Sequence, residues 1–216
     1  MPPNGPMAYT VWQWLQFWMS VNLSGRQIGQ CDLILQIDRI LRQSDLDGID
    51  LVLEITESAL IENMNAVSKI LPYFKDRRIK LALDDFGMGF SSLSYLQRLP
   101  VDILKIDRSF IQHLGIAGRD SKIVRSIVDL GLELGLEIIA EGVENECQVQ
   151  KLRLFKCPSA QGFYFSRPAD VLSATKLITS APILTSVVKM SEHGPHLHNL
   201  DSLKECKTSA NGRLQS

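Results

Sequence analysis

The side chains that could do chemistry in this 216-residue chain gather where apolar, strand-like runs end. Two adjacent aspartates, Asp84 and Asp85, close the run "IKLALDD", and a loop with glycines at positions 87 and 89 follows them. Burying carboxylates at the tip of a core element is costly unless a cation meets them there. Other runs end close to a polar residue or open on one: Asn22, Glu54, Lys105, Glu141 and Gln161. The pattern indicates a charged site.

The chemistry that suits this set is that of a hard divalent cation. Carboxylate and amide oxygens favour magnesium or manganese. Two such ions bridged by one aspartate can activate a water and neutralise a phosphate leaving group. Lys105 would orient or deprotonate that water, or stabilise charge on the phosphoryl oxygens. The alternative for Lys105 is an ion-paired or snorkelling lysine with a structural role, and any single acidic residue after a strand is more typical of a helix cap.

Adjacent strand residues point to opposite faces, so Asp84 and Asp85 can share a site only if the chain bends there. Gly87 and Gly89 would permit such a bend, because glycine adopts conformations that other residues avoid. We therefore expect an irregular end to this strand.

Six apolar, β-branched runs are expected to be the strands that position these residues: 17–22, 50–55, 79–85, 102–107, 136–141 and 160–165. Residues 32–48, 64–78 and 121–135 have helical spacing. Gly48 is expected to cap the first helix, and Pro72 to kink or restart the second. Strands that alternate with crossover helices predict a parallel sheet, either an α/β barrel or a doubly wound sheet. In a barrel the carboxyl ends of the strands form the active-site face.

Composition and charge narrow the class of partner. The chain is 45% hydrophobic with a net charge of -1, which is typical of a globular protein and gives no reason to expect a nucleic-acid polymer or an acidic membrane. The segment Val11 to Val21 holds all three tryptophans but is too short to span a bilayer. We expect it to be buried, with a surface-lying amphipathic segment as the alternative. Four scattered cysteines without zinc spacing predict reduced thiols and a cytoplasmic location.

We predict three regions: a Trp-rich segment over residues 1–19, a folded domain over 20–178, and a disordered tail over 179–216. The tail contains His193, His196 and His198, for which we expect only adventitious metal binding, because nothing nearby orients the rings.

Five segments together resemble the EAL family of bacterial cyclic di-GMP phosphodiesterases: "VNLSGRQ", "LVLEITES", "LALDDFGMGFSSLSYLQRLPVDILKIDRSFI", "EIIAEGVE" and "QGFYFSRP". The resemblance covers roughly residues 20–168 and makes residues 20–178 a partial EAL domain. It implies a modified TIM barrel with about six of eight strands present. It also implies Mg²⁺ or Mn²⁺ in a two-metal site, and hydrolysis of cyclic di-GMP to linear pGpG.

The resemblance also implies a role for each candidate residue. Asn22, Glu54, Asp84 and Asp85 match metal ligands. Lys105 and Glu141 match catalytic groups that position the attacking water, and Gln161 matches a substrate-site residue. Glu57 matches a glutamate that holds the loop after the aspartates and links metal binding to a homodimer. A plain helix-start carboxylate would look the same at Glu57.

The chain departs from the family in ways that weigh against activity. It contains no Glu-Ala-Leu motif, whose glutamate is a metal ligand in the family, and about the first quarter of the family domain has no counterpart. Met88 and the Lys156-Cys157-Pro158 stretch also depart from the family pattern. Three interpretations stay open: an active phosphodiesterase, a catalytically silent module that binds cyclic di-GMP or a protein, and a non-functional remnant. We expect weak metal binding, little turnover and self-association through open sheet edges at "MSVN" and "GFYF".

Overall fold

The structure is a computed structural model that describes residues 18–87, 100–114, 119–180 and 187–189. Its strands are β1 (Met19–Asn22), β2 (Leu51–Thr56), β3 (Lys80–Phe86), β4 (Ile103–Ile106), β5 (Glu137–Ala140), β6 (Ser159–Gln161) and β7 (Val187–Lys189). The helices are α1 (Gly25–Ile28), α2 (Leu33–Ser44), η3 (Gly48–Asp50), α3 (Glu57–Glu62), α4 (Met64–Asp76), α6 (Arg108–Gln112), α7 (Arg119–Glu133), α8 (Glu146–Leu154) and α9 (Val171–Ser180).

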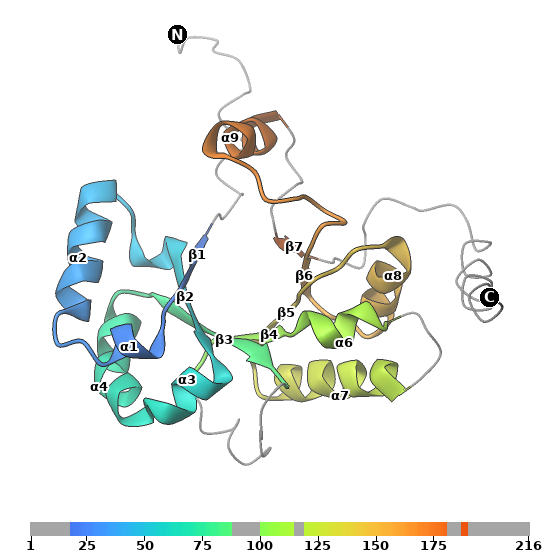
Figure 1. Cartoon of the computed structure of the whole chain (residues 1–216), viewed down its shortest axis with the longest axis horizontal. Coiled ribbons are helices and arrows are strands. Elements are labelled where there is room, and N and C mark those ends of the chain that lie inside the picture. The colour runs from blue at the N-terminus through green and yellow to red at the C-terminus, as the bar shows by residue number, and fades with distance from the viewer. Residues whose placement is uncertain (1–17, 88–99, 115–118, 181–186, 190–216) are drawn as a thin grey trace, which may run out of the picture.

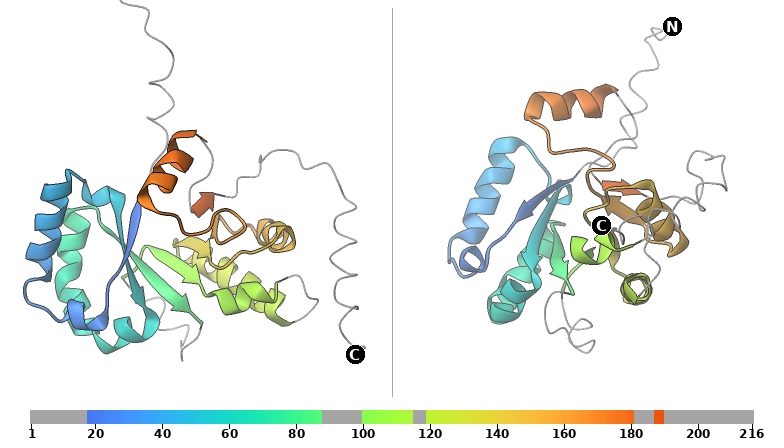
Figure 2. Two further views of the ribbon diagram at one scale, coloured as in Figure 1. Left: turned by 45° about the horizontal axis from the view of Figure 1, so that its top comes forward. Right: turned by 45° about the vertical axis from the view of Figure 1, so that its right-hand side comes forward.

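The strands lie in one sheet in the order of the sequence, β1 to β7. The first six are parallel, and β7 pairs antiparallel with β6. The sheet curls into a half-barrel, with α1 to α4 beside its first strands and α6 to α8 beside the later ones (Figures 1 and 2). This confirms the predicted α/β fold, an incomplete TIM-like barrel.

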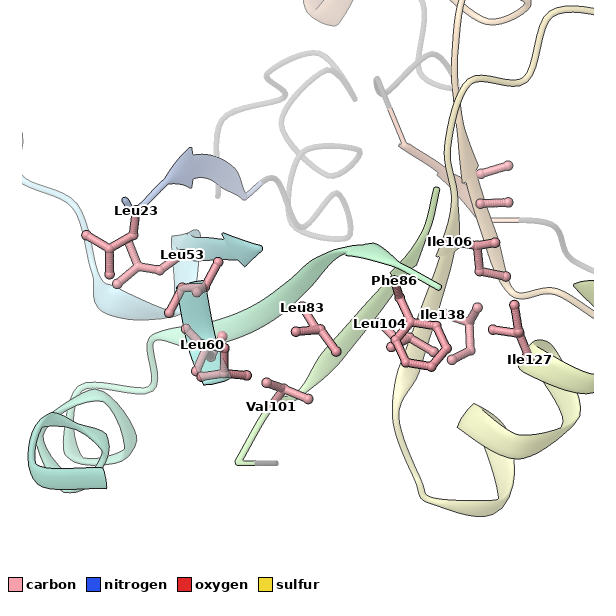
Figure 3. Packing of buried hydrophobic residues seen from close by; sticks show 14 of the residues in the cluster. Leu23, Leu53, Leu60, Leu83, Phe86, Val101, Leu104, Ile106, Ile127 and Ile138 are labelled. Carbon is pink, nitrogen blue, oxygen red and sulfur yellow. The ribbon is translucent and has the colours of Figure 1, made fainter. Parts of the chain in front are cut away.

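The two faces of the sheet bury different side chains. Leu53, Leu83 and Leu104 belong to a large core with residues of the helices, and Figure 3 shows Ile127 of α7 beside Ile138. The alternate residues of the same strands form a small second cluster, Val52, Ala82, Ile103 and Ile139, with Trp18 packed against it. Because side chains alternate along a strand, the next residues on this inner face are Glu54, Asp84, Lys105 and Glu141. On the inner face, each of these charged residues therefore follows a residue of the small apolar cluster, toward the carboxyl end of the same strand.

One local prediction about helices was wrong, and one of two alternatives offered for another is excluded. The residue in left-handed conformation after α2 is Asp45, with φ +53°, rather than Gly48. Gly48 instead begins η3, where a Cβ would lie 2.1 Å from the Arg77 carbonyl oxygen, so its lack of a side chain serves close packing. Pro72 does not restart a helix, because α4 continues through it to Asp76, and the kink that was the other alternative stays a prediction.

The last part of the sheet also differs from expectation. The predicted strand over 160–165 is shorter, since β6 ends at Gln161 and Gly162 turns the chain against Val143. We expected an open sheet edge along "GFYF". The strand at this position is β6, and its edge is not open, because β7 pairs with it. The sequence did not predict β7, which falls within the segment expected to be disordered. At the other edge, the four residues of β1 are exposed.

Candidate metal and phosphodiester site

Lys105 forms the centre of a buried charged cluster on the inner face of the sheet. Its Nζ lies 2.8 Å from Glu54 Oε2, 3.0 Å from Asp84 Oδ1 and 2.6 Å from Glu141 Oε1. These residues come from four neighbouring strands or their ends, β2, β3, β4 and β5, so the parallel register alone brings them together. The Lys105 side chain is only 4% exposed. One ammonium group therefore meets three carboxylates with little solvent between them.

The end of β3 is bent where the two aspartates lie. Asp85 has φ +55°, in the left-handed region, and the register between β3 and β4 shifts between Leu83 and Phe86. This bend releases Asp85 from the alternation of a regular strand, as the sequence led us to expect. Gly87 follows with φ +102°, and a Cβ there would lie 2.6 Å from the ring of Phe110. The irregularity thus begins at Asp85 itself and continues through the first glycine.

The bend brings a group of carboxylates within reach of one cation. One oxygen each from Asp84, Asp85 and Glu141 lies within 4.8 Å of the others. Asp84 Oδ1 is buried and has no partner in hydrogen-bonding geometry among the described residues, although Lys105 Nζ is 3.0 Å away. This ammonium is shared with Glu54 and Glu141, so the buried Asp84 carboxylate is only partly compensated and would gain from a further cation. The donor set and this oxygen both fit a hard divalent ion.

The pKa values reflect the excess of negative charge. Burial disfavours the charged form of Lys105, but the carboxylates of Glu141 and Glu54 outweigh burial and raise its pKa above the usual 10.5. Burial also raises the pKa of Glu141, against the lowering effect of Lys105. The pKa of Asp85 is raised by burial, then by the charges of Asp84 and Asp107. The single cation does not compensate all of its neighbours, so the cluster favours a further positive charge.

The other predicted site residues lie around this cluster. Asn22 ends β1 opposite Glu54 in the register and is exposed. Gln161 ends β6 and is half-buried, and its carbonyl accepts from the Val143 N–H at 3.1 Å. Glu57 begins α3, is buried, and has its Oε2 3.5 Å from the Gly87 nitrogen. Met88 and most of the loop after the aspartates lie outside the described residues, so the loop-holding role of Glu57 stays a prediction.

Sequence reasoning missed one acidic residue beside the site. Asp107 is 9% exposed and caps α6 by accepting from the Ser109 N–H at 2.9 Å. Its charge contributes to the raised pKa of Asp85. The available signal was its place two residues after Lys105, on the same face of an extended chain.

The cysteines and helices bear on two further expectations. Cys31 and Cys157 are free thiols, as predicted, whereas Cys147 is disulfide-bonded, which the scattered cysteines did not predict. Within the described part of the chain, none of the helices is both long and apolar enough to cross a membrane. Residues 1–17 of the predicted Trp-rich segment and the histidines of the tail lie outside the described residues, whereas Trp18 packs against the inner cluster.

Curated relatives match most of the chain. Cyclic di-GMP phosphodiesterase NbdA of Pseudomonas aeruginosa is 39% identical over 160 residues, which cover 74% of this chain and 20% of the relative. Bifunctional diguanylate cyclase/cyclic di-GMP phosphodiesterase MucR of the same species is 41% identical over 162 residues, 75% of this chain and 23% of the relative. The chain therefore spans about a fifth of the length of these relatives.

Solved structures of phosphodiesterase and EAL proteins are also similar to this chain, and some of them are metal complexes. The c-di-GMP complex of the PaMucR phosphodiesterase has a TM-score of 0.68 and 40% identity, covering 73% of this chain and 64% of that one. The manganese and c-di-GMP complex of Klebsiella pneumoniae BlrP1 at pH 9.0 has a TM-score of 0.67 and 31% identity, covering 71% and 40%. The sequence model of the EAL domain matches residues 10–168. With its half-barrel and its acidic cluster, this chain belongs to the EAL domain family.

Proposed function

We propose that this chain binds cyclic di-GMP at the acidic cluster and hydrolyses it to linear pGpG with a divalent metal, Mg²⁺ or Mn²⁺. The observation that carries the proposal is the buried cluster in which one ammonium, Lys105 Nζ, is shared by the carboxylates of Glu54, Asp84 and Glu141. The names of the relatives and the manganese complex of a related structure support the same chemistry.

Asp84, Asp85 and Glu141 would hold one ion, and Glu54 and Asn22 are the further residues that would help to hold a second. Bound divalent ions supply neutralisation of phosphate charge and activation of a water. Glu54 is held by Lys105 at 2.8 Å, so this lysine keeps one carboxylate oriented while it presents its ammonium to the site.

Lys105 acts as a hydrogen-bond donor in this proposal rather than as a base. Its Nζ lies 2.6 Å from Glu141 Oε1, and this contact fixes that side chain. An ammonium in a buried site stabilises charge that develops on phosphoryl oxygens more strongly than one in water. Glu141 and Lys105 together would orient the water, and Gln161 would contact the substrate from the end of β6.

A second candidate is a catalytically silent module that binds cyclic di-GMP. The exposure of Asn22 on the edge strand β1 favours it, because an exposed amide holds a cation less firmly than a buried one. Fewer ligands lower the charge available to hold the second ion without abolishing the first.

One experiment separates these functions. Turnover of cyclic di-GMP to pGpG is followed by chromatography in the presence of about 1 mM Mn²⁺, a concentration that also fills weak sites. Binding of cyclic di-GMP is measured in parallel. Turnover that disappears in Lys105→Met, at a temperature where circular dichroism shows this variant to be folded, supports the phosphodiesterase. Binding without turnover supports the silent module, and neither binding nor turnover contradicts both.

A further inference from the structure

The loop from Glu141 to Asn145 joins β5 to α8 and is held against the start of α6. The Glu141 N–H donates to the Ile106 carbonyl at 3.1 Å. The chain then turns at Gly142 with φ +67°, where a Cβ would lie 2.5 Å from the Cβ of Arg108. The loop that carries Glu141 therefore packs directly on the helix that follows Lys105.

A second set of contacts ties this loop to the segment after β6. Val143 is fully buried, its N–H donates to the Gln161 carbonyl at 3.1 Å, and its carbonyl accepts from the Tyr164 N–H at 2.9 Å. A Cβ on Gly162 would lie 2.3 Å from both the nitrogen and the oxygen of Val143. The backbones that carry Glu141 and Gln161 are thus joined through one residue.

The side-chain amide of Gln148 in α8 closes this arrangement. Gln148 is 2% exposed, and its Oε1 accepts from the N–H groups of Glu144 at 2.7 Å and Asn145 at 3.1 Å. Its Nε2 donates to the Ile111 carbonyl of α6 at 3.1 Å. Capping of α8 requires only the bond to the Asn145 N–H, since Asn145 is the N-cap. The bonds to Glu144 and to Ile111, 37 residues away, go beyond capping.

We propose that Gln148 is a positioning residue for the acidic site, which holds the Glu141 loop at a fixed distance from the helix that follows Lys105. This inference rests on the proposed function only where it concerns the metal. Without the amide, the Glu144 and Asn145 N–H groups and the Ile111 carbonyl would all lose a buried partner. The Glu141 carboxylate would then be less well placed beside Lys105, Asp84 and Asp85. Groups that hydrogen-bond directly to metal ligands change metal affinity by about 10- to 100-fold, so a residue that acts through the loop backbone should lie at the lower end of that range.

The test replaces Gln148 with methionine, which has a similar shape but no amide group to donate or accept these hydrogen bonds. Mn²⁺ affinity is measured by calorimetry on the whole chain, and hydrogen exchange of residues 142–145 and 108–112 by mass spectrometry. We expect the Mn²⁺ affinity of Gln148→Met to fall about tenfold and exchange in both segments to become faster.

Two variants of the same helix serve as controls. Gln150→Met removes an amide whose Nε2 donates, among the residues that the structure describes, to Glu146 Oε1 alone at 3.4 Å, and should leave Mn²⁺ affinity and exchange in both segments unchanged. Val149→Ala removes buried apolar atoms and should lower thermal stability while it leaves Mn²⁺ affinity unchanged.

Wild-type Mn²⁺ affinity in Gln148→Met would overturn the positioning role, as would a loss no larger than that in Val149→Ala. If the wild-type chain itself binds no Mn²⁺, the proposed function fails, and the exchange data alone decide the positioning role. Faster exchange in both segments would then support it, and unchanged exchange would overturn it.

Discussion

Two lysines on the inner face of the sheet meet carboxylates in very different surroundings. Lys80, at the amino end of β3, pairs with Glu137 at the start of β5, with Nζ 2.5 Å from Oε1. Their side chains are 37% and 52% exposed. Lys105, at the carboxyl end of β4, contacts three carboxylates and is 4% exposed. The pair and the cluster both involve β3 and the β5 region on the same face of the sheet. They differ in which end of the strands they occupy.

The difference shows which of the two clusters can be explained by stability alone. A solvated one-to-one pair gains little from its attraction and costs little to form. In a buried cluster with three carboxylates and one ammonium, removing every charge from water costs free energy, and a net negative charge remains. Stability alone therefore accounts for the Lys80 pair but not for the Lys105 cluster, which would gain from a bound cation.

The largest expected effect is that of Lys105→Met. Removing one partner of a buried ion pair leaves uncompensated charge, so we expect the free energy of unfolding to fall by about 3–5 kcal/mol. Chemical denaturation without metal measures this. Added Mn²⁺ should restore part of the loss, because a second cation can neutralise the same carboxylates. A variant as stable as wild type would mean that the cluster is more solvated than its geometry indicates.

An intermediate effect is expected at a third pair, which joins α2 to α4. Arg77 binds Asp38 through Nε at 2.7 Å and Nη2 at 3.1 Å, and its guanidinium lies 4.4 Å from the centre of the Tyr73 ring. The Arg77 hydrogen bond holds the pKa of Asp38 below its usual 3.8, against a smaller opposing effect of burial. A lowered carboxylate pKa stabilises the fold above the usual value, and this stabilisation is lost as the pH falls through the lowered pKa.

Asp38→Asn should therefore melt at a lower temperature than wild type at pH 7. The gap should narrow as the pH falls from 3.8 through the lowered pKa of Asp38, because protonation of wild-type Asp38 removes the charge that Arg77 stabilises. Melting curves by circular dichroism from pH 7 down to the acid limit of folding measure this. A gap that stays constant over that range would show that packing against Tyr73, rather than charge, accounts for the effect.

The smallest effect is expected for Lys80→Met. An exposed pair contributes about 0–1 kcal/mol, and high salt should reduce even that. The same denaturation experiment with and without salt checks it. A loss close to that of Lys105→Met would remove the contrast between the two clusters.

The sequence predicted what depends on periodicity and missed what depends on local backbone geometry. The six parallel strands and the convergence of Glu54, Asp84, Lys105 and Glu141 follow from apolar runs that end in polar residues, because parallel strands place their carboxyl ends together. The left-handed Asp45 and Asp85 were missed as such, since only glycine is routinely assigned that conformation from sequence.

Interactions between segments distant in the sequence account for the remaining differences. β7 exists in the sheet only through its pairing with β6, and three residues of "VVK" carry too little pattern to predict it. The buried amide of Gln148 looks like an ordinary polar residue of a helix, because its partner Ile111 is identified only by the fold. Likewise, one lysine between three carboxylates is a fact of the register rather than of any single motif.

The most direct test of the central claim is calorimetry of Mn²⁺ binding by wild type, Asp84→Asn and Glu137→Gln. Asp84 lies at the buried cluster and Glu137 at the exposed pair, so the two variants remove one negative charge each from the two regions compared. We predict binding heat in wild type and Glu137→Gln, and its loss in Asp84→Asn. Heat that persists unchanged in Asp84→Asn would contradict the assignment of a metal site to this cluster.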